Sequence, residues 1–215
     1  MTYSVSMSRE PLTRPRILHR AIAIADAEGI AKLSMRRLGE ALGVEAMSLY
    51  NHVKNKDDLL DGMIDEVAAE FEVPEGPWRQ ALAGRARRAH EVLMAHPWAA
   101  QLFLSRVTAG PNHLAYVEKT LACLTGAGFT LPQADHVWNA LDAHVYGFTL
   151  QRLNFPFAPE DYAAAARDYA PMIPAEVFPN LRAMSDMVAS GAHDGLQSLD
   201  FGLEFLLDGF ERLLS

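Results

Sequence analysis

This sequence of 215 residues has almost no cysteine and no long apolar segment. A single cysteine, Cys123, excludes an internal disulfide framework and fits a reducing compartment. Cys123 lies in an apolar helical pattern, so we expect a core position rather than a redox sensor. No apolar run reaches the roughly 18 residues of a membrane span, and the N-terminus lacks the apolar stretch of a signal peptide. The sequence therefore predicts a cytoplasmic protein without a membrane partner.

Motifs for catalysis and metal binding are also lacking. The sequence holds no phosphate-binding loop, no Gly-x-Ser-x-Gly elbow and no His-Glu-x-x-His helix. His136 and His144 are eight residues apart, which is two helical turns and too far for shared ligation. We therefore expect no enzyme activity, no cofactor and no metal site.

Strand-like alternation is absent, and half of the residues are hydrophobic, which is enough for a sizeable core. The apolar spacing and the positions of proline and glycine predict helices throughout. We expect them over residues 15–28, 34–42, 45–52, 55–71, 78–96, 98–107, 114–124, 131–153 and 198–214. Residues 155–197 are less regular, with short helices over 160–169 and 178–188. The predicted fold class is all-α.

The segment from Ser34 to Val53 predicts two short helices joined by a tight turn at Gly43. Ser34 is a suitable N-cap, and Gly43 suits the left-handed end of the first helix. The second helix is too short to be stable alone, so it must dock on neighbours. Leu38, Leu42, Leu49 and Val53 are among the residues expected on the docked side. This pattern is typical of a DNA-reading helix-turn-helix, although a helical hairpin in an unrelated bundle would share it.

The charge distribution agrees with a nucleic-acid-binding head. Residues 1–56 hold nine Lys and Arg against five Asp and Glu, a net charge of +4. Residues 57–215 hold ten against 22, a net charge of −12, and the whole chain carries −8. A basic head on an acidic body is expected when only the head meets phosphates.

The run from Gly43 to Leu60, with its Leu-Tyr-x-His-Val-Lys-Asn-Lys core, resembles the TetR family of one-component transcriptional repressors. The resemblance is to the tetracycline repressor's branch, and it extends to the last helix at 201–204 and 209–211. It implies an N-terminal three-helix DNA-binding domain over residues 1–56 and a ligand-binding and dimerisation domain over 57–215. Residues 57–71 would be the connector helix. Residues 1–13 are polar and are expected to be flexible. Arg9, with Arg14 and Arg16 just beyond, could form a basic arm near the DNA backbone, but a plain disordered tail is the favoured alternative.

The resemblance also assigns roles on the DNA. Arg36 would reach a guanine edge, and Arg37 would contact phosphate or Glu40. Tyr50, His52 and Lys56 would grip the backbone, which fixes register. The full predicted surface comprises Ser34, Arg36, Arg37, Ala46, Met47, Ser48, Tyr50, Asn51, His52 and Lys56. Ala46 replaces a glutamine of the tetracycline repressor and Asn51 a tryptophan, so the operator should differ from the tetracycline operator.

A ligand pocket is expected among the middle helices, with apolar walls and a few polar anchors. Its predicted lining comprises Arg85, Phe103, Arg106, Val117, Thr120, Trp138, Asn139, Asp142, Phe148 and Gln151. An ordinary core with surface polar residues is the alternative. Phe103 and Gln151 stand at the histidine and glutamate positions that hold magnesium in the tetracycline-binding branch. Neither is a good ligand for a hard cation, so we expect a predominantly apolar organic effector without magnesium.

The last helix is apolar around most of its circumference, so it must be buried on more than one side. The resemblance implies that it pairs with the 131–153 helix. These two helices and their copies in a second chain would form a four-helix dimer interface. The predicted interface residues are Gly202, Phe205, Gly209 and Phe210. Burial within one chain is the alternative.

Together these features predict a ligand-responsive repressor that binds a palindromic operator on double-stranded DNA as a homodimer, and that a small organic effector releases. The other function class is a helical ligand-binding or protein-partner module without specific DNA regulation. The intact Tyr50, His52 and Lys56 set argues against it.

Overall fold

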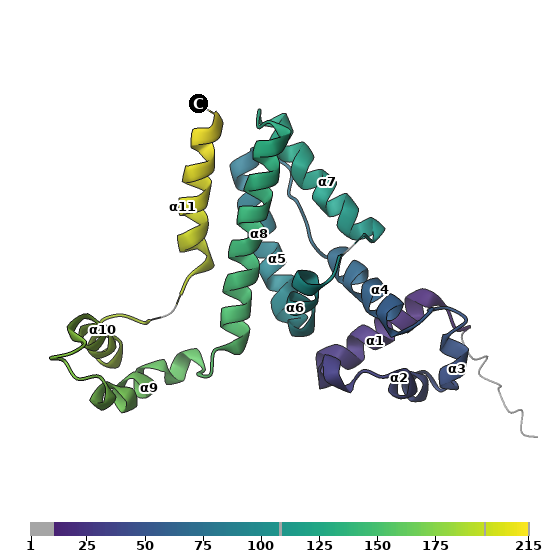
Figure 1. The fold of residues 1–215 in the computed structure, drawn as a ribbon, viewed down its shortest axis with the longest axis horizontal. Coiled ribbons are helices and arrows are strands. Elements are labelled where there is room, and N and C mark those ends of the chain that lie inside the picture. Colours follow the sequence, from purple (N-terminus) through teal and green to yellow (C-terminus); the bar gives the residue numbers. More distant parts are fainter. Residues whose placement is uncertain (1–10, 108, 196, 215) are drawn as a thin grey trace, which may run out of the picture.

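The computed structural model describes residues 11–107, 109–195 and 197–214, so residues 1–10 of the arm predicted over 1–13, with Arg9, lie outside the described residues. Every regular element within the described ranges is a helix, which confirms the all-α prediction. Figure 1 shows a small N-terminal bundle beside a larger helical body, with helix α4 between them. None of the described helices is both long and apolar enough to cross a bilayer.

The N-terminal bundle consists of α1 (Arg14–Glu28), α2 (Met35–Leu42) and α3 (Ala46–Leu49), followed by α4 (Lys56–Ala68). The predicted cap at Ser34 is confirmed, because its Oγ accepts the backbone N–H of Arg37. Asn55 Oδ1 likewise accepts the backbone N–H of Asp58 at the start of α4. Gly43 ends α2 in the left-handed conformation, with φ of 66°. The predicted inward residues are buried, and they include Ile17, Leu18, Ala21, Ile24, Ala25, Leu38, Leu42, Leu49 and Val53.

Helix α3 is shorter than the predicted range 45–52. After Leu49 the backbone closes tighter bonds, from Tyr50 N to Met47 O and from His52 N to Leu49 O. These bonds span three residues instead of four, so the chain continues as a turn rather than as α-helix.

The body comprises α5 (Trp78–Ala95), α6 (Pro97–Ser105), α7 (Pro111–Gly126), α8 (Leu131–Asn154), α9 (Tyr162–Tyr169), α10 (Pro179–Ala189) and α11 (Leu199–Glu211). Helix α8 is central and packs against α5, α6, α7 and α11. Thr130 and Gln133 form a capping box at its start. Helices α9 and α10 pack mainly on each other, and the pair projects away from the body (Figure 1).

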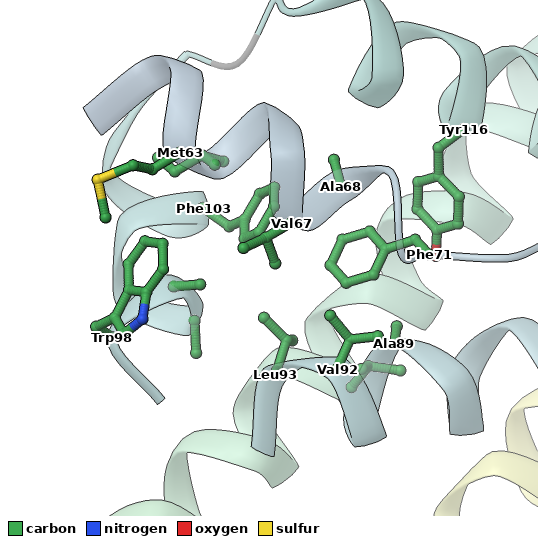
Figure 2. Close-up of a cluster of buried hydrophobic side chains, with 14 of the residues drawn as sticks. Met63, Val67, Ala68, Phe71, Ala89, Val92, Leu93, Trp98, Phe103 and Tyr116 are labelled. Atoms are coloured by element: carbon green, nitrogen blue, oxygen red, sulfur yellow. The ribbon is translucent and has the colours of Figure 1, made fainter. Parts of the chain in front are cut away.

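One cluster of buried apolar side chains joins the head to the body (Figure 2). Val67, at the end of α4, and Phe71, in the connection that follows it, lie against Leu93 of α5, Phe103 of α6 and Tyr116 of α7. The ring centroids of Phe71 lie 5.3 Å from Phe103 and 5.0 Å from Tyr116. Aromatic pairs at such distances stabilise packing beyond the area they bury. The C-terminal end of α4 is therefore part of the body's core.

Arg14 corrects one prediction, because it is not part of a basic arm. It lies in the first turn of α1, and its guanidinium binds both carboxylate oxygens of Asp58 at 2.9 and 3.0 Å and the carbonyl oxygen of His52 at 3.0 Å. Asp58 also accepts the backbone N–H of Lys54 at 2.7 Å. This bidentate pair ties α1, the end of the helix-turn-helix and α4 together.

Asp58 should make the stability of the head depend on pH. The hydrogen bond from Arg14 lowers the pKa of Asp58 below its ordinary value of about 3.9. The stabilisation is therefore fully present above about pH 4 and is lost as pH falls through the lowered value. Asp58→Asn should cost about 1 kcal/mol at pH 7, given the half-exposed pair.

Urea unfolding of both proteins between pH 7 and pH 3 tests this. The difference between them should shrink as the solution becomes acidic. Glu118→Gln, at an exposed position of α7, is the control and should change little. A difference that stayed constant down to pH 3 would contradict the role of the ion pair.

Candidate DNA-binding surface and ligand-binding core

The predicted DNA-reading residues form the outer side of the N-terminal bundle. Met47 is 75% exposed and Tyr50 43% exposed, although both are large and partly apolar. Asn51 and Lys56 are exposed, whereas Ala46, Ser48 and His52 are partly covered. Because Leu49 and Val53 hold this segment from beneath, its outer side stays free to meet a groove.

Of the two arginines of α2, Arg37 has a partner other than the predicted one. Arg36, whose side chain is 88% exposed, is the one that binds Glu40, at 2.9 Å. Arg37 instead bonds Glu28 at the end of α1, at 2.5 Å. The i, i+4 spacing explains the first pair, while only the folded bundle brings Glu28 beside Arg37. Arg36 is thus the more available of the two for DNA.

The close approach of α2 to α3 depends on Gly39. A Cβ atom at this buried position would lie 2.9 Å from the carbonyl oxygen of Val44 and 3.1 Å from the backbone nitrogen of Ala46. Backbone atoms cannot rotate away as side chains do. Gly39 therefore helps to fix the angle at which α3 is presented.

A buried polar network lies in the body at the meeting point of α5, α7 and α8. Arg85, with no exposed surface, donates from Nε to Thr120 Oγ1 at 2.9 Å and from Nη1 to Asp142 Oδ1 at 2.7 Å. Asp142 Oδ2 accepts Trp138 Nε1 at 2.6 Å. The structure thus assembles four of the predicted pocket residues into one constellation.

Aromatic residues surround this network. The Arg85 guanidinium lies 4.5 Å above the ring of Tyr116, and Tyr146 of α8 is 6.2 Å from Phe103 between ring centroids. Burial raises the pKa of both tyrosines well above the ordinary value, so both remain neutral phenols. Phe71, Tyr116 and Tyr146 are not among the pocket residues predicted from the sequence. The four-residue spacing of Tyr116 from Thr120, and of Tyr146 from Asp142, could have indicated the two tyrosines.

Two predicted pocket residues lie elsewhere. Arg106, at the end of α6, binds Asp61 at 2.7 Å and Asp57 at 3.1 Å on α4, so it is a link to the connector rather than a ligand anchor. Asn139 is exposed on α8 and donates to the carbonyl oxygen of Asp135. In both cases the side chain stays at the surface and bonds a polar partner there, which avoids the cost of desolvating it in the interior.

The remaining predicted pocket residues occupy other positions. Val117 is half-buried on α7. Phe148 and Gln151 lie near the end of α8 and line two adjoining cavities of about 370 and 500 Å³, next to Gln197. The predicted pocket residues therefore do not line one cavity. Arg85, Thr120, Trp138 and Asp142 form the buried network, whereas Phe148 and Gln151 line the two cavities near the end of α8.

Of the predicted interface residues, Gly202 and Phe210 face the protein's own body. A Cβ atom at Gly202 would meet the His144 ring of α8, and Phe210 is buried. Phe205 is 65% exposed, and a Cβ at Gly209 would meet nothing within 4 Å. Within one chain, Gly202 and Phe210 therefore serve the packing of α11 on its own body, and the interface with a second chain stays a prediction.

Family models match almost the whole described chain. Residues 17–63 match the bacterial regulatory proteins of the tetR family, and residues 72–214 match the tetracyclin repressor-like C-terminal domain. The chain belongs to the TetR family of bacterial transcriptional regulators. This confirms the resemblance in the helix-turn-helix and extends it over the helical body.

Similar proteins include characterised regulators of this family. The transcriptional repressor DrrR1 of Streptomyces coeruleorubidus is 33% identical over 95% of this chain and 79% of its own length. A class D tetracycline repressor of Escherichia coli is 29% identical over 95% and 91%. The structure of ActR of Streptomyces coelicolor in complex with actinorhodin superposes with a TM-score of 0.81, at 33% identity over 96% of this chain and 100% of that one.

Gly39→Ala should destabilise the head and weaken DNA binding, because the added methyl group meets backbone atoms. Overpacking of this kind costs about 1–3 kcal/mol. Thermal unfolding and fluorescence anisotropy with operator DNA would measure both effects. Gly126→Ala, where a Cβ meets nothing within 4 Å, is the matched control and should leave both unchanged. Equal behaviour of the two variants would show that the α2–α3 contact tolerates a side chain.

Proposed function

We propose that this protein is a homodimeric repressor that binds a palindromic operator and is released by a small organic effector. The observation that carries this proposal is the single helix, α4, which begins beside the helix-turn-helix and ends in the ligand-binding core. The repressor DrrR1 and the ActR–actinorhodin complex support it, because both relatives cover most of this chain. The protein would act on DNA in the cytoplasm and would catalyse no reaction.

The dimer would form on the exposed sides of α8 and α11. Phe201 and Phe205 of α11 are 71% and 65% exposed and pack edge to face, with ring centroids 5.1 Å apart. Ala143 and Gly147 are exposed on α8, which would allow another helix to come close. A large exposed apolar face beside small residues is typical of an interface. A twofold axis here would place two heads on one palindrome.

DNA binding would use the head in the roles that the family pattern assigns. Tyr50, His52 and Lys56 would hold phosphates, while Ala46, Met47 and Ser48 would meet base edges. Arg36 would leave Glu40 to reach a guanine. Half-sites should lie about one helical turn apart, roughly 34–36 Å between centres.

Release would follow from the contacts that α4 makes with the body. Phe71 touches the aromatic residues of the core, and Arg106 and Asp65 hold α4 to α6 and α7. A ligand that separates α5, α7 and α8 would therefore shift α4 and change the spacing of the two heads. A coupling of about 1–3 kcal/mol gives a 5- to 150-fold change in affinity.

The test of this proposal is a gel-shift titration of the purified protein on its own upstream intergenic DNA. We expect a saturable complex that 150 mM added salt weakens and that unrelated DNA of equal length does not form. Absence of any sequence preference would favour the second function class, a ligand-binding module without specific regulation.

Lys56→Ala and Arg36→Ala should have different effects on DNA binding. Lys56→Ala should weaken all sequences about equally and lower the salt dependence by roughly one unit of slope. Arg36→Ala should relax specificity at one base pair, at a cost of about 1–3 kcal/mol. Anisotropy titrations on the operator and its single-base variants measure both. Lys119→Ala, on the exposed surface of α7, is the control. An identical, sequence-independent loss from both head variants would refute the assignment.

Phe205→Asp and Gly209→Leu should each dissociate the dimer at micromolar concentration while the monomer stays folded. The first places a charge on the apolar face, and the second adds bulk where a helix would approach, at a cost of about 1–3 kcal/mol. Sedimentation equilibrium and circular dichroism are the measurements. Leu104→Asp, at a position of α6 that is 57% exposed, is the matched control. A wild-type monomer at micromolar concentration would overturn the proposed interface.

A further inference from the structure

His96 stands at the corner between α5 and α6, and both of its ring nitrogens face carboxylates. Nδ1 lies 2.8 Å from Oδ1 of Asp26, in the last turn of α1. Nε2 lies 3.1 Å from Oε1 of Glu70, just after α4. The His96 side chain is only 12% exposed. One imidazole ring thus joins the DNA-binding head, the end of the connector and the body.

Only the doubly protonated ring of His96 can complete both of these hydrogen bonds. An ionised carboxylate accepts hydrogen bonds and donates none, and a neutral imidazole has one donor and one acceptor. In the neutral ring, one nitrogen lone pair would face a carboxylate oxygen. The negative charges of Asp26 and Glu70 would also lose the cation that separates them. The junction is therefore complete only while His96 is an imidazolium.

Two permanent donors hold the carboxylates beside His96. Trp98 of α6 donates its Nε1–H to Asp26 Oδ1 at 2.7 Å, and Arg88 of α5 lies 4.0 Å from Glu70. Neither donor changes its charge between pH 5 and 8, whereas histidine does. Loss of the proton from His96 would therefore loosen one side of the junction without dismantling it.

Other charged groups line the same junction. His19 of α1 and Glu66 of α4 lie 3.5 Å apart and share a surface hollow with Asp26 and Glu70, and Glu91 lies 3.5 Å from Arg88. The side chain of His19 is 68% exposed. A single carboxylate needs a single N–H, which a neutral imidazole keeps. His19 can thus hold Glu66 in either charge state, unlike the histidine between two carboxylates.

The place of the junction on α1 gives it control over the head. Arg14, in the first turn of α1, pairs with Asp58 and ties the head to the start of α4. Asp26 lies roughly 18 Å further along the helix and ties the head to the body. With both ends of α1 held, the angle of the head is fixed. Two heads that are already oriented lose less freedom when they bind one palindrome, so the closed junction favours DNA binding.

We propose that Asp26, His96 and Glu70 form a proton-dependent clasp that positions the DNA-binding head, and that operator affinity increases when His96 is protonated. His96 is a positioning residue, since it acts through α1 and α4. This inference rests on the proposed function, because it concerns the affinity of the same head for the operator. The contribution of the clasp is present at the acidic end of the histidine range and is lost as the pH rises through it.

Two substitutions fix the charge at this position. His96→Gln is neutral at every pH and presents donors on one side only, whereas His96→Lys keeps its positive charge. Fluorescence anisotropy on the upstream DNA of the gel-shift titration measures their dissociation constants at pH 6 and pH 8, at constant ionic strength. At pH 6 the wild type should match His96→Lys and bind at least about five-fold more tightly than His96→Gln. At pH 8 it should match His96→Gln.

His19→Gln is the matched control, because it removes the other histidine of the junction. It should follow the wild type at both pH values. Thermal unfolding is a second readout, which needs no DNA. The melting temperature of the wild type should exceed that of His96→Gln by more at pH 6 than at pH 8, because the proton completes the clasp.

An affinity ratio between wild type and His96→Gln that is the same at both pH values would overturn the clasp. So would a ratio that changes in the opposite direction, or loss of the pH dependence in His19→Gln. If a His96 variant does not fold by circular dichroism, Asp26→Asn replaces it. Trp98 can still donate to this asparagine, and the pH dependence should again disappear. If none of the proteins binds the DNA, the proposed function fails, and the melting temperatures alone decide on the clasp.

Discussion

Helix α4 is held by its own carboxylates, each of which bonds a different part of the molecule. Asp58 pairs with Arg14 of the head, Asp57 and Asp61 with Arg106 of α6, and Asp65 with the start of α7. Single half-exposed ion pairs contribute little stability, but several on one helix fix its position from opposite sides. These bonds hold α4 between the head and the body, and Asp26 of α1 adds a direct contact through its bonds with His96 and Trp98. In the proposed release by an effector, α4 would be one route by which a shift in the body reaches the head.

The features that could be predicted from the sequence were those decided by near neighbours in the chain. Ser34, Gly43 and Asn55 cap helices through groups within three or four residues, so local spacing suffices to locate them. The buried face of α1 follows from the 3.6-residue period alone. The family pattern was recognisable because its motif is carried by consecutive residues, and it indicated the layout of the body but not the positions of its pocket residues.

What could not be predicted depends on partners far apart in the chain. Helix α7 starts at Pro111 instead of Leu114 because Asp65, 47 residues earlier, accepts the backbone N–H of Asn112 and also that of His113. Arginine is a residue type that can anchor a ligand, but the carboxylate partners of Arg106 on α4 hold it outside the core. Gly202 shares a helical face with Gly209, and only the position of His144 shows that the two glycines meet different surroundings.

The polar network of the core is a poor source of stability for a protein of this size. Buried ion pairs often contribute less than apolar residues of the same volume would. Arg85, Asp142 and Trp138 would then be retained for what they recognise. Phe103 is buried whereas Gln151 is exposed on α8, so the two positions at which the resemblance implies a magnesium site in the tetracycline-binding branch have different surroundings in this chain.

The projecting pair α9–α10 leaves apolar side chains exposed on a single chain. Met172, Val177 and Leu181 are more than half exposed on or beside it, as are Phe201 and Phe205 on α11. A lone chain with this much apolar surface would adhere to other proteins and to itself. In the proposed dimer on α8 and α11 a second copy would cover Phe201 and Phe205, and mass action would then set a lower limit to the cellular amount of this regulator.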